Sequence, residues 1–117
     1  MKLYGISNCN TVKKARDWLT INSMAYEFQD FKKGVADKAL LIDWLKQQPW
    51  EKLVNRAGMT WRNLSDTEKS LVIDSASALN LMLEKTSVIK RPVLVKDGQI
   101  ISLGFSEQAY KQAFSVT

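Results

Sequence analysis

The feature that most constrains the fold is a short apolar run followed at once by a helical pattern, both near the start of the chain. The run Leu3–Ile6 is typical of a buried strand. Apolar residues then recur at helical spacing, at Val12, Ala15 and Leu19. The sequence therefore predicts a strand, a turn over Ser7–Asn10, and a helix from Thr11 to Ile21.

This turn contains Cys9, the only cysteine of the chain. The first turn of a helix directs unpaired N–H groups and the positive end of the helix dipole at such a residue, and both lower the pKa of a thiol. Basic side chains follow in the helix, at Lys13, Lys14 and Arg16. Two interpretations are open: Cys9 is a reactive thiolate, or it is a small buried hydrophobe without chemistry. Its polar neighbours, Asn8 and Asn10, favour the first.

The absence of histidine from the sequence narrows the chemistry further. Histidine is the usual general base of cysteine hydrolases and the commonest metal ligand. Activation of Cys9 would therefore have to come from the helix terminus and from Lys or Arg. The sequence predicts no metal site.

Composition and charge bound the class of protein. A chain of 117 residues suits one domain, 1–117, with a core that needs no disulfide. One cysteine fits a reducing compartment, and the sequence contains no secretory signal or membrane-length apolar segment, so we expect a cytoplasmic protein. The net charge is +5, but Lys and Arg are dispersed among Asp and Glu. We therefore expect neither a nucleic acid nor a membrane partner.

A second strand is predicted over Ala25–Phe31, where apolar and polar residues alternate. Two strands joined by one helix form a parallel, right-handed unit. This topology places the Cys9 turn at the carboxyl end of its strand, where open sheets usually carry their sites.

The middle of the chain shows helical patterns. One helix presents Leu41, Trp44 and Leu45 on one face and stops before Pro49. Ser65–Glu68 has the form of a capping box, which predicts a helix from Asp66, and another helix begins near Asp74. The large apolar residues of this stretch are predicted to be core rather than cofactor ligands, namely Trp44, Trp50, Trp61, Met82 and the leucines.

The last third predicts a hairpin and a helix. Val93–Val95 and Ile100–Ile101 are short apolar strands around Asp97-Gly98, a strong signal for a tight hairpin turn. Ser106 is placed to cap the last helix. The two residues placed to form a hydrophobic staple across this cap are Phe105 and Tyr110.

Three blocks of the sequence resemble the arsenate-reductase-like family (ArsC, Spx and YffB) of thioredoxin-fold proteins. The blocks are YGISNCNTVKKAR (4–16), LVNRAGMTWRNL (53–64) and IKRPVLV (89–95). The predicted order of elements is also thioredoxin-like: β-α-β, a helical insertion over about residues 36–86, then β-β-α, with a small mixed sheet flanked by helices. The most similar branch is the YffB type, whose members are regarded as glutathione-dependent thiol reductases.

The resemblance implies roles for particular residues. Cys9 corresponds to the catalytic nucleophile, and Pro92 to the cis-proline that faces it. Arg56 and Arg91 correspond to arginines that hold an anion beside the nucleophile. With the turn and first helical residues, these form the candidate site for glutathione as co-substrate, and the candidate binding residues are Asn8, Asn10, Thr11, Lys13, Arg56, Arg91 and Pro92. The second substrate would be a disulfide or a mixed disulfide.

Two departures from the family pattern limit what the resemblance implies. Arsenate reductases have a third arginine after the last strand, where this chain has Leu103-Gly104-Phe105, so arsenate reduction is not favoured. Many Spx-type regulators carry a Cys-x-x-Cys pair, whereas Cys9–Val12 holds one thiol. Two functions stay open: a monothiol reductase, or a regulatory protein that binds a partner such as RNA polymerase and keeps a vestigial or sensory Cys9.

Overall fold

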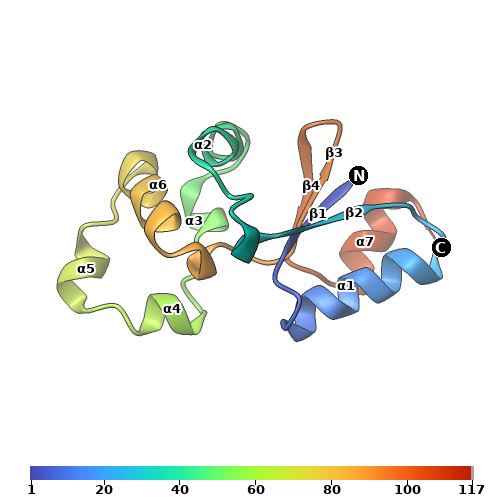
Figure 1. Cartoon of the computed structure of the whole chain (residues 1–117), viewed down its shortest axis with the longest axis horizontal. Coiled ribbons are helices and arrows are strands. Elements are labelled where there is room, and N and C mark those ends of the chain that lie inside the picture. Colours follow the sequence, from blue (N-terminus) through green and yellow to red (C-terminus); the bar gives the residue numbers. More distant parts are fainter. Residues whose placement is uncertain (117) are drawn as a thin grey trace. The chain divides into compact units, whose positions relative to one another are not determined.

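The computed structural model describes residues 1–116, and the chain divides into two compact units. Met1–Val35 and Arg91–Thr117 make up one, called the sheet unit here, and Ala36–Lys90 make up the other, the helical unit. Figure 1 shows the strands in the first and a series of helices in the second. The sequence predicts an insertion over about 36–86; the helical unit runs to Lys90.

The sheet unit is a four-stranded mixed sheet with two helices. Its strands occur in the spatial order β2-β1-β3-β4, with β1 parallel to β2 and antiparallel to β3, and β3 antiparallel to β4. The predicted β-α-β and β-β-α halves are therefore confirmed. The elements are β1 (Lys2–Gly5), α1 (Asn10–Ile21), β2 (Glu27–Asp30), the 3-10 turn η1 (Phe31–Lys33), β3 (Val93–Lys96), β4 (Gln99–Leu103) and α7 (Glu107–Phe114).

Strand β2 is shorter than the alternating pattern predicts. The strand was expected to reach Phe31, but it ends at Asp30, whose carboxylate accepts a hydrogen bond from the N–H of Lys32 at 2.9 Å. This bond turns the chain into η1, where Phe31 is buried and its ring stacks on that of Tyr4. Phe31 is therefore buried, as the alternating pattern suggests, but from the 3-10 turn rather than from the strand.

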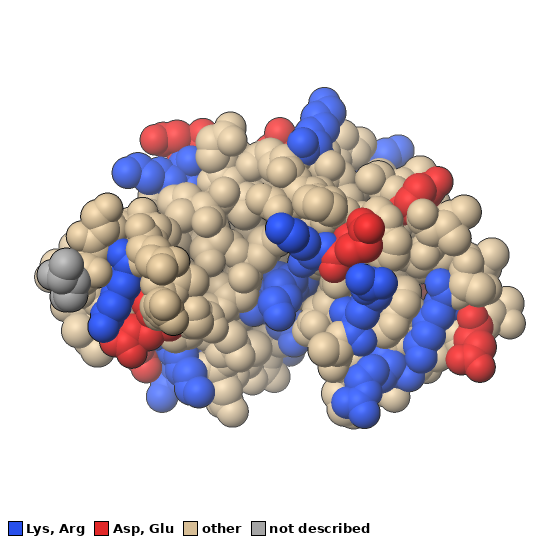
Figure 2. All heavy atoms as spheres, turned by 180° about the vertical axis from the view of Figure 1, so that it is seen from behind, with Lys and Arg blue, Asp and Glu red and all other residues tan. Residues whose placement is uncertain are grey.

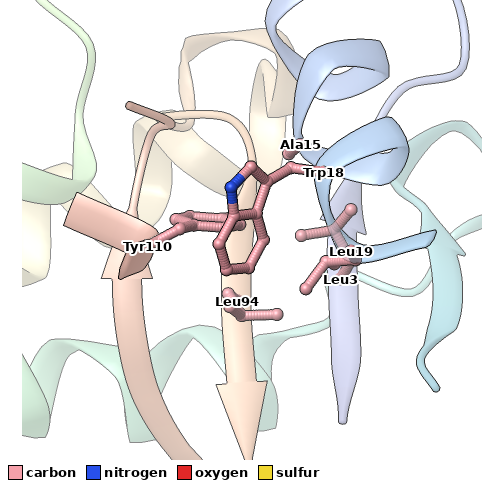
Figure 3. Packing of buried hydrophobic residues seen from close by; sticks show 6 residues of the cluster. All are labelled: Leu3, Ala15, Trp18, Leu19, Leu94 and Tyr110. Carbon is pink, nitrogen blue, oxygen red and sulfur yellow. The ribbon is translucent and has the colours of Figure 1, made fainter. Parts of the chain in front are cut away.

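Both helices of the sheet unit pack on one face of the sheet. Leu3 of β1 pairs in register with Leu94 of β3, so their side chains lie on the same face. They form a buried cluster with residues of α1 and α7, namely Ala15, Trp18, Leu19 and Tyr110. Figure 3 shows the Trp18 indole between Tyr110 and the leucines, and the Trp18 and Tyr110 ring centroids lie 5.3 Å apart, edge to face. This packing holds α1, and with it the turn that precedes it, against the sheet.

The local signals at the end of the chain are confirmed. Asp97 and Gly98 both adopt positive φ, as a two-residue hairpin turn of the primed type requires. The hydroxyl of Ser106 accepts a hydrogen bond from the N–H of Ala109, and the rings of Phe105 and Tyr110 meet edge to face at 4.7 Å. The predicted cap and staple therefore fix where α7 begins.

The helical unit consists of short helices with well-formed caps. The Ser65 side chain and Glu68 form a reciprocal capping box, as predicted, and Asp74 and Ser77 form a second one. A single bridge pairs Val54 with Ile89. The elements are α2 (Lys38–Gln47), α3 (Trp50–Leu53), α4 (Met59–Arg62), α5 (Asp66–Ser70), α6 (Ser75–Glu84) and the 3-10 turn η2 (Thr86–Val88).

The predicted core of this unit is only partly right. Trp44 and Met82 are fully buried, whereas Trp50 and Trp61 are half-buried. Leu71 is 67% exposed and Leu83 is 37% exposed, so the expectation that the leucines are core is wrong for these two. Leu71 directly follows a helix of five residues, which is too short to hold an apolar face against a core.

None of the helices among residues 1–116 is both long and apolar enough to cross a membrane.

Candidate functional site

The turn that carries Cys9 is set by a close approach between β1 and α1. A Cβ atom at Gly5, the last residue of β1, would lie 2.7 Å from a methyl group of Val12. Val12 is buried in the first turn of α1, so only glycine allows the strand end and the helix start to come this close. Cys9 lies between them as the N-cap residue of α1.

The surroundings of Cys9 favour its thiolate. Partial burial is the largest single influence and raises the pKa of the thiol. The backbone N–H of Val12, the Arg91 side chain and the backbone N–H of Thr11 act against burial, and the net pKa lies below the ordinary value of a cysteine. The amides at the start of α1 are directed at the sulfur and favour its charged form. Cys9 therefore has the electrostatic environment of a nucleophilic thiol.

The charge that acts on Cys9 comes from across the sheet unit rather than from α1. The guanidinium of Arg91 interacts with the sulfur by a hydrogen bond and by its charge. The sequence predicts positive charge from the next residues of the helix, but Lys13, Lys14 and Arg16 are not what lowers the pKa. Proximity in the sequence did not indicate this partner, whereas the family resemblance implied an arginine beside the nucleophile at position 91.

The Arg91–Pro92 peptide bond is cis, which confirms the expectation drawn from the family resemblance. Pro92 is buried directly before β3, and its carbonyl accepts a hydrogen bond from the N–H of Gly104 at 2.8 Å. Arg91 therefore lies just before the start of β3, the strand that pairs with β1. The structure brings Cys9 and Arg91 together within the sheet unit.

The remaining predicted site residues fall into two groups. Asn8, Asn10, Thr11 and Lys13 are exposed around the turn and the first turns of α1. Arg56 belongs to the helical unit, where it is exposed and its guanidinium lies 5.4 Å from the centre of the Trp50 ring. Their roles in binding stay predictions.

Two other features of the sheet unit were not predicted from the sequence. Lys14 lines a cavity of about 520 Å³ together with residues of α7. Lys13 and Arg16 line a second cavity of about 400 Å³ that begins at Ser7, beside the Cys9 turn. The helical spacing of Lys13 and Arg16 from Cys9 is the signal that could have indicated this second cavity.

No three His, Cys, Asp or Glu side chains gather as a potential metal site anywhere in residues 1–116. On the face drawn in Figure 2, acidic side chains lie among the basic ones.

The sequence profile of the ArsC family matches residues 4–113. The chain belongs to the ArsC family. Its four-stranded sheet with flanking helices is the thioredoxin-like fold of that family. The predicted fold class and family are thus confirmed.

Relatives of known structure extend over almost the whole chain. The solved structure of a protein named YFFB superposes with a TM-score of 0.87 at 43% identity and covers 96% of each chain. An arsenate reductase (ArsC) related protein from Brucella melitensis superposes with a TM-score of 0.79 at 46% identity, covering 97% of this chain and 92% of the other.

An uncharacterized protein of Haemophilus influenzae is 37% identical over 113 residues, 97% of each chain. YusI, an uncharacterized protein of Bacillus subtilis, is 25% identical over 114 residues, 96% of each chain. The ArsC-family fold together with these relatives suggests a thiol reductase kind of function, which is a form of oxidoreductase chemistry.

Proposed function

We propose that this ArsC-family protein is a glutathione-dependent thiol–disulfide reductase in which Cys9 is the only nucleophile. The observation that carries the proposal is the environment of Cys9, whose pKa is lowered by the amides of Val12 and Thr11 and by Arg91 despite partial burial. A thiol with a lowered pKa is present as thiolate to a larger extent at neutral pH, and the thiolate is the attacking species in disulfide exchange.

The proposed reaction takes two exchange steps. The Cys9 thiolate attacks the glutathione sulfur of a mixed disulfide, its bond to the substrate sulfur breaks, and the substrate leaves as a thiolate that takes up a proton. Free glutathione, as thiolate, then attacks the glutathione sulfur bonded to Cys9 and regenerates the Cys9 thiolate. The sum converts one mixed disulfide and one glutathione into one substrate thiol and one glutathione disulfide. Since the chain has a single cysteine, the resolving thiol must come from outside.

Arg91 has two roles in this proposal. Its permanent charge stabilises the resting thiolate, and its forked donors suit the carboxylate of a bound glutathione. The backbone beside Pro92 would align the peptide of glutathione. Arg56, Asn8, Asn10 and Thr11 are proposed as further contacts from the family resemblance.

The experiment measures turnover of a glutathione mixed disulfide with and without added glutathione. Wild-type protein should require glutathione, and Cys9→Ser should have no activity above background while it keeps its melting temperature. Arsenate should be reduced poorly or not at all, because Leu103, Gly104 and Phe105 stand where arsenate reductases have their third arginine. Undiminished turnover in Cys9→Ser would refute the mechanism.

The pH dependence of alkylation tests the state of the thiol directly. The rate of reaction with iodoacetamide should follow a titration whose midpoint lies below that of a free cysteine, and Arg91→Ala should move the midpoint upward. Arg62→Ala, at an exposed arginine of α4, is the matched control and should leave it unchanged. An unshifted wild-type midpoint would favour the other function left open, a regulatory binding protein with a vestigial Cys9.

A further inference from the structure

We propose that a recess along α1 binds the amino-acid end of a γ-glutamyl thiol, its ammonium and its carboxylate, while the sulfur of that thiol lies at Cys9. This inference rests on the proposed function and specifies its substrate class. The recess has a volume of about 400 Å³, and it is lined by Ser7, Lys13, Arg16, Asp17, Thr20 and Tyr26. We call it the α1 recess.

The α1 recess begins at Ser7, two residues before Cys9, and follows one side of the helix. Residues three or four apart on a helix share a face, so Lys13, Arg16, Asp17 and Thr20 form one stripe along α1. The N–H of Lys13 donates to the Cys9 carbonyl at 2.9 Å, so the helical spacing holds from the first turn. A ligand joined to the Cys9 sulfur can therefore extend along this stripe into the recess.

Arg16 is held in position for a ligand. Its Nε donates to the hydroxyl of Tyr26 at 3.1 Å, and its guanidinium carbon lies 4.2 Å from the centre of the Phe28 ring. These two contacts fix the plane of the guanidinium and use one of its five N–H donors. The four Nη protons remain for a bidentate contact with a carboxylate.

The charges lining the recess match a zwitterion rather than a simple anion. Lys13 and Arg16 supply two positive charges, and Asp17 supplies one negative charge beside them. Within residues 1–116, none of these three side chains takes part in a salt bridge. A group that carries a carboxylate and an ammonium on one carbon complements this set, whereas an inorganic anion leaves Asp17 opposed to it.

The reach of the recess selects among thiols that carry an amino-acid group. Arg16 lies seven positions after Cys9 along α1, a rise of about 10 Å. An extended γ-glutamylcysteinyl group spans roughly 10 Å between its sulfur and its α-carboxylate. In free cysteine the ammonium and the carboxylate lie within a few bonds of the sulfur. Its carboxylate therefore cannot reach Arg16 while its sulfur lies at Cys9. The geometry therefore favours a γ-glutamyl thiol over cysteine and over cysteinylglycine.

The test uses unreactive ligands, so that binding is measured apart from turnover. S-methylglutathione, its desamino analogue (S-methyl-N-glutarylcysteinylglycine) and S-methylcysteinylglycine are titrated into the protein and followed by amide NMR shifts. S-methylglutathione should bind about tenfold more tightly than either analogue, since a charge-assisted contact is lost in each. Its shifts should include the amides of Lys13, Arg16 and Asp17.

Variants assign the effect to the recess. Asp17→Asn should remove the difference between S-methylglutathione and the desamino analogue, because only the ammonium distinguishes them. Lys13→Gln should weaken binding of both, whereas Lys14→Gln, the adjacent lysine that lines a different cavity, should change neither. Tyr26→Phe tests positioning of Arg16. It should weaken S-methylglutathione and the desamino analogue, which both carry a carboxylate at the end of the γ-linked acyl group, and leave S-methylcysteinylglycine, which lacks that group, unaffected.

The outcomes separate this inference from the proposed function. Equal binding of the three ligands, or shifts that exclude α1, would overturn the α1 recess even if glutathione-dependent turnover is normal. If S-methylglutathione binds selectively in the recess but wild-type protein shows no turnover, the reductase function is refuted and the proposed binding site is supported.

Discussion

The sheet unit and the helical unit stabilise their elements in different ways. In the sheet unit, residues far apart in the chain meet in one buried cluster that joins β1, α1, β3 and α7. In the helical unit, short helices with local capping boxes at Ser65 and Asp74 pack around buried side chains such as Trp44 and Met82. Large apolar side chains are exposed in the helical unit at Met59, Leu71, Ile73 and Leu83, and in the sheet unit at Ile21. The comparison teaches that the reactive thiol lies in the unit in which helices pack against a sheet.

The largest expected difference in stability is between a core aromatic and an exposed leucine. Tyr110→Ala should lower the free energy of unfolding by about 3–5 kcal/mol, because the Tyr110 ring is fully buried against Trp18, Phe105 and Phe114. Leu71→Ala, at an exposed position of the helical unit, should change it by less than about 0.5 kcal/mol. Urea denaturation of both variants measures the two values. Equal losses would mean that the burial of Tyr110 does not decide its contribution to stability.

The next effect distinguishes the two arginines. Arg91→Ala and Arg56→Ala should each weaken glutathione binding roughly tenfold to hundredfold, the equivalent of about 1.5–3 kcal/mol for a charge-assisted hydrogen bond. The free energy of unfolding should stay nearly constant in both. Only Arg91→Ala should also raise the pKa of Cys9, because Arg91 acts on the thiolate.

Lysine in place of either arginine should bind glutathione better than alanine but more weakly than arginine. The lysine ammonium keeps the positive charge but cannot donate the two parallel hydrogen bonds of a guanidinium. Calorimetric titration gives the affinities and alkylation against pH gives the pKa. Lower melting temperatures with unchanged affinity per folded molecule would make both arginines structural and remove the anion site.

Much of the fold could be predicted because its signals are local. The Asp97-Gly98 turn, the Phe105–Tyr110 staple and the Ser65 capping box each depend on residues within a few positions of one another, and all three are confirmed. The family blocks predicted the cis bond before Pro92.

The errors have two sources: local hydrogen bonds and helix lengths that periodicity does not report, and contacts between residues distant in sequence. The pattern cannot show that Asp30 ends β2 by bonding the backbone of Lys32, nor that Leu71 follows a helix too short to bury it. It assigned the charge near Cys9 to neighbouring residues of α1, whereas Arg91 is brought in by the antiparallel pairing of β3 with β1. Pairing of strands across the chain is the information that periodicity lacks.

A smaller effect is expected at the cap of α7. Ser106→Ala removes the hydroxyl that accepts from the N–H of Ala109 and should cost about 1 kcal/mol of unfolding free energy. Ser106→Asp retains an acceptor and should restore most of it. Thermal denaturation of the three proteins checks the order, and a loss as large as that of Tyr110→Ala would mean that α7 depends on its cap rather than on its packing.

The smallest effect is a pH dependence confined to the helical unit. Hydrogen bonds from the backbone N–H and the hydroxyl of Ser77 hold the pKa of Asp74 below its ordinary value. The folded state therefore binds fewer protons than the unfolded state in the interval between the two pKa values. The contribution of Asp74 to stability is complete above its ordinary pKa, about 4, and is lost as the pH falls through the folded value.

Hydrogen exchange of the α6 amides between pH 5 and 3 should accordingly show faster opening at the acid end in wild-type protein. Asp74→Asn keeps an N-cap acceptor without a titrating charge and should remove this trend, while amides of α1 serve as the internal reference. A trend of the same size in the asparagine variant would assign it to another group.

Gly5 has a consequence for how the sequence can vary. It has no side chain with which to bind or react, yet a single added methyl group would meet Val12 at 2.7 Å and separate the end of β1 from the start of α1. In a library of all single substitutions selected for activity, position 5 should therefore tolerate change as poorly as Cys9 itself. The requirement for glycine is a steric one, imposed by the space that the first turn of α1 occupies.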